Sequence, residues 1–103
     1  MRFTPREQFI DFDYSAPASD VWSMAATLYF LLTLNLPRDE YSDQSELEAL
    51  MNPIVPIAER SAEVPGELAR CIDRALSDDV HVRPKDGAHL RKDMMAALGL
   101  YPI

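Results

Sequence analysis

The stretch SDVWSMAATLYFLLT, from Ser19 to Thr33, predicts an α-helix. Ser19 suits the N-cap position, and Asp20 is favourably placed against the helix dipole. Apolar residues follow the 3.6-residue period at Val21, Met24, Ala25, Leu28, Leu31 and Leu32. Others occupy the opposite side, at Trp22, Ala26, Tyr29 and Phe30. A helix that is apolar on all sides is typical of the inside of a larger protein or a membrane, and this one is too short and too closely flanked by charge for a membrane.

The composition indicates one small folded domain. At 103 residues, with 48% hydrophobic and 26% charged residues, the chain has room for only a modest core. Its formal net charge is −7, and its ten Lys and Arg residues are scattered along the sequence. We therefore expect no nucleic-acid partner and no anionic membrane partner, and a helical DNA-binding domain is the least favoured interpretation.

Cysteine usage and hydropathy indicate the compartment. Cys71 is the only cysteine, which excludes an internal disulfide and agrees with a reducing environment. No segment has the length of apolar sequence that a membrane-spanning helix needs, and the N-terminal MRFTPREQ lacks the apolar stretch of a signal peptide. We therefore expect a cytoplasmic protein.

The first half of the chain has few regular elements besides the opening helix. Residues 1–18 show no helical or alternating pattern and are expected to form an irregular loop. Ser45 and Glu48 have capping-box spacing, which predicts a short helix in SELEALM. The run that contains Pro53 and Pro56 is expected to be an extended connection.

Two further helices are expected in the second half. The segment PGELARCIDRALSDD has helical spacing of its apolar residues, with Cys71 on the packed face. A last helix is expected from about Asp86 to Leu98, with Gly99 at the left-handed C′ position and Pro102 just beyond. The predicted fold class is therefore all-α, with about four helices joined by irregular connections.

A search for catalytic and metal-binding groups assigns none. The three glycines lie at predicted helix ends, so no phosphate-binding loop is indicated. His81 and His89 match no zinc spacing, and Asp11 and Asp13 lie in a loop without further ligands, so we assign no metal. Cys71 on an apolar helix face is expected to be an inert thiol rather than a nucleophile.

The order of three segments is nevertheless specific. TPREQ, then SDVWSMAATLYFLLT, then DRALSDDVHVRP closely resembles the C-terminal portion of the large lobe of a bacterial-type (Hanks-type) serine/threonine protein kinase. Pro5-Arg6-Glu7 resembles the Ala-Pro-Glu motif that ends the activation segment of that family. LSDDVHVRP resembles its Leu-x-x-Asp-Pro-x-x-Arg-Pro stretch. Three positions depart from the family pattern, and these are Arg6 in place of proline, Ala25 in place of glycine, and Val80 where Asp-Pro is expected.

The resemblance implies a single partial domain over residues 1–103, the helical subdomain of the kinase-like large lobe. Residues 1–18 would be the end of the activation segment with the loop after it, and residues 19–103 the helical part. The family surrounds its central helix with the catalytic loop and with earlier helices, which explains apolar residues on every side.

The resemblance also implies roles for individual residues. Glu7 would form a partly buried ion pair with Arg83. Asp20 would bind the backbone of a catalytic loop that these residues do not include, and Trp22 would pack in the core. The substrate-facing loop would contain Phe3, Thr4 and Pro5.

The implied function is phosphorylation of proteins in an intact kinase, with ATP and Mg²⁺ as its cofactors. The motifs that bind ATP, Mg²⁺ and the substrate hydroxyl are not in these residues, so we predict no catalysis and no cofactor for this chain by itself. Its partners would be proteins: the rest of a kinase lobe, a substrate protein, or a second copy bound through the central helix. The alternative is a stand-alone helical interaction module derived from such a lobe, in which the exposed side of the central helix and the short helix at Ser45 to Met51 bind another protein. The resemblance permits this, because kinase relatives often use the region of that short helix for docking.

Overall fold

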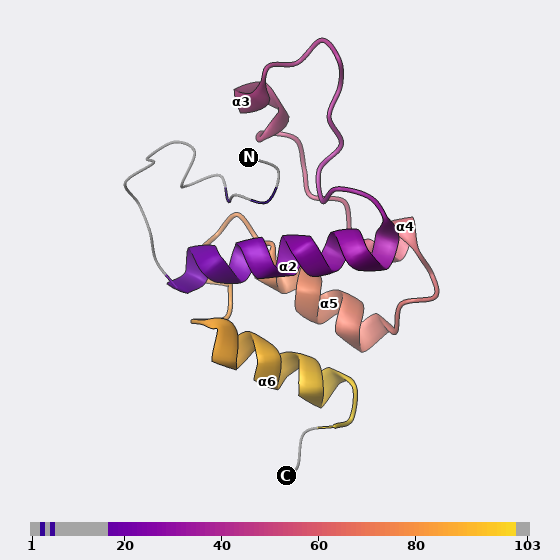
Figure 1. Cartoon of the computed structure of the whole chain (residues 1–103), viewed down its shortest axis with the longest axis vertical. Helices are drawn as coiled ribbons and strands as arrows, with labels where there is room; N and C mark the ends of the chain where they lie inside the picture. The colour runs from indigo at the N-terminus through magenta and orange to yellow at the C-terminus, as the bar shows by residue number, and fades with distance from the viewer. Residues whose placement is uncertain (1–2, 4, 6–16, 101–103) are drawn as a thin grey trace.

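The computed structural model describes Phe3, Pro5 and residues 17–100, and this part of the chain is helical. Its helices, labelled as in Figure 1, are α2 (Pro17–Thr33), α3 (Glu46–Ala49), α4 (Ile57–Arg60), α5 (Gly66–Ala75) and α6 (Gly87–Ala97). The described residues contain no β-strand, only an isolated bridge between Arg38 and Ile54. The expected all-α class is confirmed for this part of the chain. None of its helices has the length and apolar character required to cross a membrane.

The hydrophobic core lies between α2 and the pair formed by α5 and α6, over which α2 runs (Figure 1). Its buried side chains come from α2, α4, α5 and α6, with one from the residue that follows α5: Val21, Trp22, Ala25, Ala26, Tyr29, Ile57, Leu68, Ala69, Ile72, Ala75, Leu76 and Leu90. Burying each of the larger ones contributes about 1.5–3 kcal/mol. The core thus contains the apolar face that the sequence predicts for α5.

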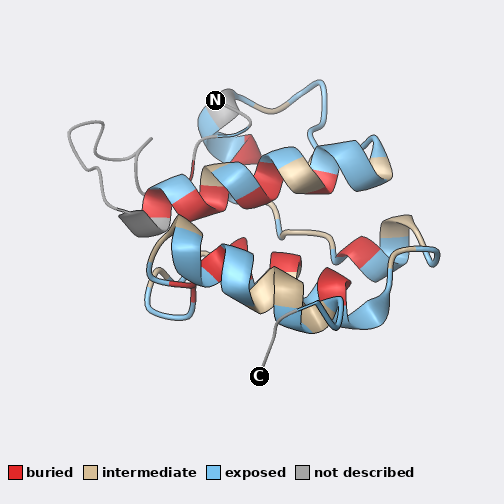
Figure 2. Ribbon diagram, turned by 60° about the horizontal axis from the view of Figure 1, so that its bottom comes forward, coloured by how far each residue is buried: buried red, intermediate tan, exposed pale blue. Residues whose placement is uncertain are grey.

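One face of α2 remains exposed. Asp20, Met24, Thr27 and Leu31 recur at helical spacing and all face solvent, as the pale blue side of α2 shows (Figure 2). Leu31 is 66% exposed, although it lies in the middle of an apolar sequence. Although α2 carries apolar residues on all sides, the core therefore buries only some of them.

The expected N-cap at Ser19 is wrong, because α2 begins at Pro17, a residue that suits the first turn of a helix, and Ser19 lies inside the helix. Two other expected local signals are present in detail. Ser45 Oγ accepts the Glu48 N–H at 3.1 Å, and the Glu48 carboxylate accepts the Ser45 N–H at 3.3 Å, which is a capping box. Gly99 has φ 72°, and the N–H groups of Gly99 and Leu100 bind the carbonyls of Ala96 and Met95. This Schellman motif places a glycine where a side chain would be strained.

The expected extended connection around Pro56 is wrong at Ile57–Arg60, which forms the single turn α4, so the described residues contain five helices instead of about four. An isolated turn of this length is unstable in water. Here Ile57 is fully buried, and its N–H donates to the Asp73 carboxylate on α5 at 3.2 Å. Contacts with α5 therefore stabilise a turn that the local sequence does not indicate.

The C-terminus of α2 has an unexpected conformation. Leu34 has φ 58°, in the left-handed region, and its N–H donates to the Phe30 carbonyl at 2.7 Å. Glycine or asparagine usually occupies this position, because other residues lose about 1–2 kcal/mol there. The Leu34 side chain is 78% exposed, so its own packing does not compensate for that conformation.

Candidate functional site

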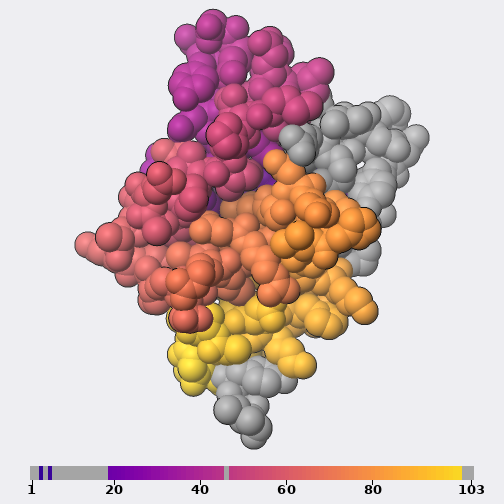
Figure 3. Space-filling view, turned by 180° about the vertical axis from the view of Figure 1, so that it is seen from behind, coloured from indigo at the N-terminus to yellow at the C-terminus, as the bar shows by residue number. Residues whose placement is uncertain are grey.

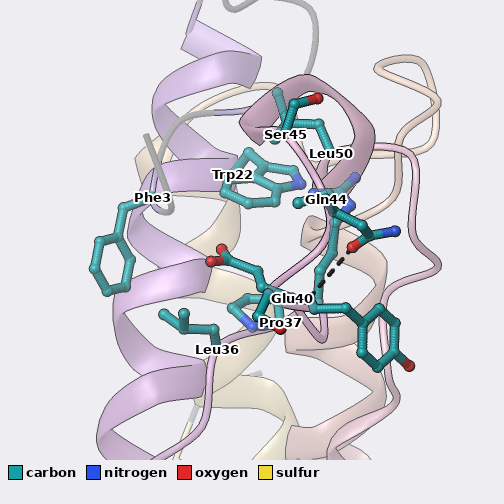
Figure 4. A pocket seen from close by; sticks show the side chains of 12 residues that line it. Phe3, Trp22, Leu36, Pro37, Glu40, Gln44, Ser45 and Leu50 are labelled. Carbon is teal, nitrogen blue, oxygen red and sulfur yellow. Dashed lines mark hydrogen bonds between the residues drawn. The ribbon is translucent and has the colours of Figure 1, made fainter.

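A cavity lies between α2 and the segment that leads to α3 (Figure 4). Its volume is about 810 Å³, which is within the usual range for ligand-binding sites. Residues 36–50 supply most of its wall, and Trp22 and Phe3 close the side next to α2. In the space-filling view this segment, in purple and magenta, projects from one end of the molecule (Figure 3). We treat this cavity, called the α2–α3 cavity below, as the candidate site.

Trp22 and Arg38 form the base of the cavity. Trp22 is 1% exposed, and its indole N–H donates to the Leu76 carbonyl at 2.9 Å. The Arg38 guanidinium lies 5.6 Å from the centre of the Trp22 ring, a distance at which a cation is attracted to the ring face. Both residues are thus fixed before any ligand arrives.

Arg38 is also bound on its other sides. Its Nε donates to the Asn52 carbonyl at 2.9 Å, and its Nη2 forms an ion pair with the Asp78 carboxylate. Only 6% of Arg38 is exposed, so its charge is compensated inside the protein. Removing either partner of this pair would leave an uncompensated charge, and Arg38 consequently joins residues 36–52 to the segment that follows α5.

Side-chain amides hold the outer wall of the cavity. Gln44 and Asn52 exchange two hydrogen bonds, at 3.1 and 2.8 Å. Asn52 Nδ2 also donates to the Asp39 carbonyl at 2.6 Å, and Gln44 Oε1 accepts the Tyr41 N–H at 3.3 Å. These bonds close the segment between α2 and α4 into a loop that keeps α3 over the cavity.

A second network ties the lower part of this loop to α2 and α4. The Tyr29 hydroxyl donates to the Val55 carbonyl at 2.6 Å and accepts the Arg60 Nε–H at 3.2 Å. Arg60 in turn forms an ion pair with Asp39 at 2.7 Å. Burial raises the pKa of the Tyr29 hydroxyl, although the hydrogen bond from Arg60 opposes this shift. The hydroxyl therefore remains a donor at neutral pH.

Two of the residues to which the sequence resemblance assigns a role lie at this cavity. Phe3 lines it and packs edge-on against Phe30, with ring centres 6.1 Å apart. Trp22 forms its base, as described above. Pro5 is buried. Thr4 lies outside the described residues, so the proposed substrate-facing loop is only partly visible.

The other sequence-selected residues lie away from the cavity. Arg83 is buried, and its Nε donates to the Ser77 carbonyl at 2.7 Å. Its expected partner Glu7 lies outside the described residues, so that ion pair stays a prediction. Asp20 is exposed in the first turn of α2, next to the helix amides, as its position in the sequence indicates.

The candidate nucleophiles and metal ligands do not converge. The described residues contain no group of three or more His, Cys, Asp or Glu side chains that would hold a metal. Burial raises the pKa of the partly buried Cys71 thiol, and the nearby Asp93 charge acts in the same direction, so the thiol stays protonated. His89 Nδ1 lies 2.7 Å from the Asp86 carboxylate, which caps α6. His89 is thus part of a helix cap.

Arg38 and Tyr29 carry no sequence signal for a site, whereas the short helix at Ser45 to Met51 was expected to bind a protein only in the interaction-module alternative. The charge pattern of residues 39–48, DEYSDQSELE, could have indicated this site. These ten residues contain five acids and no Lys or Arg. Such a charge bias on a loop differs from the mixed charges elsewhere in the chain. No protein-family model matches the chain, and no curated protein is significantly similar to it.

Proposed function

We propose that the chain is the C-terminal portion of a serine/threonine protein kinase domain, which phosphorylates proteins with ATP in its intact form. The supporting observation is that segments carrying the resemblance are packed together. The indole of Trp22, at the start of α2, donates a hydrogen bond to the carbonyl of Leu76, at the start of LSDDVHVRP. Residues 54 positions apart in sequence are thereby joined inside the core.

Arg83 fits a structural role in the proposed domain. Its guanidinium is buried with a backbone carbonyl on Nε, and a buried cation needs an anionic partner. The resemblance assigns that partner to Glu7. In the proposed domain this pair ties the end of the activation segment to the residues before α6.

The 103 residues by themselves are proposed to be non-catalytic. Phosphoryl transfer needs a lysine on the phosphates, acids on Mg²⁺, and an aspartate for the substrate hydroxyl. The sequence carries none of the motifs that supply them. We therefore expect no binding of Mg-ATP by the chain in isothermal titration calorimetry, and a measurable heat of specific binding would contradict this.

The genomic reading frame tests the kinase proposal directly. In-frame sequence upstream of Met1 should encode a His-Arg-Asp motif and an Asp-Phe-Gly motif. The protein expressed from that longer frame should then transfer labelled phosphate from ATP to a protein substrate. A frame that is closed immediately upstream, or that lacks both motifs, would overturn the proposal.

The exposed face of α2 favours a second candidate function, a helical protein–protein interaction module in the cytoplasm. Met24 and Leu31 lie on this face, the exposed Leu34 follows the end of the helix, and clustered exposed apolar side chains commonly mark association surfaces. Either the rest of a kinase lobe or a second copy of the chain would cover it. Sedimentation velocity over a hundredfold concentration range tests self-association, because a sedimentation coefficient that stays at the monomer value throughout would exclude it.

A further inference from the structure

The α2–α3 cavity has the size and lining of a peptide-binding site. Its volume is about 810 Å³, and buried side chains of Trp22, Pro37, Ala49 and Leu50 lie in its wall. Ligand sites of this kind are mostly apolar with a few placed polar groups. One or two large apolar side chains of a partner fit in such a space.

Exposed apolar side chains surround the cavity. Tyr41, on its wall, is 59% exposed, and Leu47 and Met51 of the α3 region also face solvent. Aromatic residues and methionine are enriched at protein-binding surfaces, because they offer a large contact area and adapt to different partners. The apolar surface therefore extends beyond the cavity and would accept residues on either side of an anchoring side chain.

The charges around the cavity decide the chemistry of the occupant. Residues 39–48 contain five acids and no Lys or Arg. Asp43 lies between the lining residues Ser42 and Gln44 and is exposed, and Glu48 on α3 is exposed as well. Negative charge concentrated beside a low-dielectric cavity attracts cations and repels phosphate groups.

Within the described part of the chain, Arg38 and Arg60 do not cancel this field. Arg38 is buried and paired with Asp78, so its charge is compensated below the cavity. Arg60 is paired with Asp39 at 2.7 Å. The exposed acids of the α3 region therefore keep their excess negative charge on the side from which a partner approaches.

From this combination we propose that the α2–α3 cavity binds a cationic peptide segment of a partner protein, with one apolar side chain in the cavity and Lys or Arg residues beside Asp43 and Glu48. This goes beyond the proposed kinase origin and does not depend on it. The same surface would select a basic segment in an enzyme domain and in an interaction module.

Fluorescence anisotropy with the full 103-residue chain tests the proposal. The probe is a short fluorescein-labelled peptide with several arginines around one phenylalanine. Replacing that phenylalanine by glycine should weaken binding by about 10- to 100-fold, as expected for loss of one buried aromatic side chain. Replacing the arginines by glutamates should abolish binding. Raising the salt concentration should weaken it, because the acids at the cavity are exposed.

Two variants with the same change of charge localise the site. Asp43→Lys should weaken binding of the arginine peptide by about fivefold or more. Glu63→Lys, in the loop between α4 and α5, is the matched control and should leave binding within about twofold of the wild-type value. Tyr41→Ala should also weaken binding without lowering the thermal midpoint, because the side chain is largely exposed.

Three results would overturn the proposal. The first is equal affinity for the acidic and the basic peptides. The second is an equal effect of Asp43→Lys and Glu63→Lys on binding of the basic peptide. The third is that the chain binds no peptide but self-associates, and that Tyr41→Ala abolishes this self-association. That result would show that a second copy of the chain occupies the cavity.

Discussion

Trp22 joins α2 to the end of α5, and its loss should cost a large part of the stability of the fold. Trp22→Phe removes the donor of the hydrogen bond to the Leu76 carbonyl at 2.9 Å. A buried carbonyl left without a partner costs about 1–3 kcal/mol. The weakened contact with Arg38, whose guanidinium lies 5.6 Å from the ring centre, adds about 0.5–1 kcal/mol. The expected loss is therefore about 3 kcal/mol.

Replacing Trp22 with benzothienylalanine separates the hydrogen bond from packing. This side chain keeps the bicyclic shape and the aromatic face, but its sulfur replaces the N–H and donates nothing. The expected loss is then about 1–3 kcal/mol, the contribution of the hydrogen bond alone. Tyr41→Phe, which removes an exposed hydroxyl, is the control and should change stability by less than about 0.5 kcal/mol.

Urea unfolding followed by helical circular dichroism measures all three variants. The slope of the unfolding free energy against urea concentration should stay constant, so that shifts of the midpoint report stability. The thermal midpoint should fall by about 4–8 °C for each kcal/mol in a domain of this size. A benzothienylalanine chain within about 0.5 kcal/mol of the wild type would show that the hydrogen bond to Leu76 contributes little to stability.

Three further predictions concern single elements. Leu34→Gly should raise the free energy of unfolding by about 0.5–1 kcal/mol, measured by urea unfolding, because relief of the left-handed strain exceeds the entropy that glycine adds to the unfolded chain. Burial raises the pKa of Tyr29 above its ordinary value of 10.0. The stability that its hydroxyl contributes is therefore present below pH 10 and is lost as the pH rises through the higher pKa of the folded state. Tyr29→Phe should abolish this loss of stability at alkaline pH, measured as the midpoint of urea unfolding. Hydrogen bonds from His89 hold the pKa of Asp86 below its ordinary 3.8, so the cap of α6 stabilises above about pH 4 and weakens as the pH falls through the lowered value. Thermal midpoints of Asp86→Ala should show a smaller acid-dependent fall than those of the wild type.

The elements with local signals could be predicted from the sequence. The helix over residues 19–33, which in the structure begins at Pro17, the capping box of Ser45 and Glu48, and the left-handed Gly99 depend on residues within a few positions of one another. Their hydrogen bonds form within one turn, so a short stretch of sequence contains both partners. The all-α class follows from the same signals.

The cavity, the single turn α4 and the choice of the buried side of α2 depend on contacts between residues that are far apart in the sequence. Arg38 and Asp78 are 40 positions apart, and Ile57 meets Asp73 across 16 positions. The apolar pattern of α2 is similar around its whole circumference, so it does not select a buried face. Contacts with α5 and α6 make that choice, because they supply the apolar surface that removes one side of α2 from water and leave the other exposed.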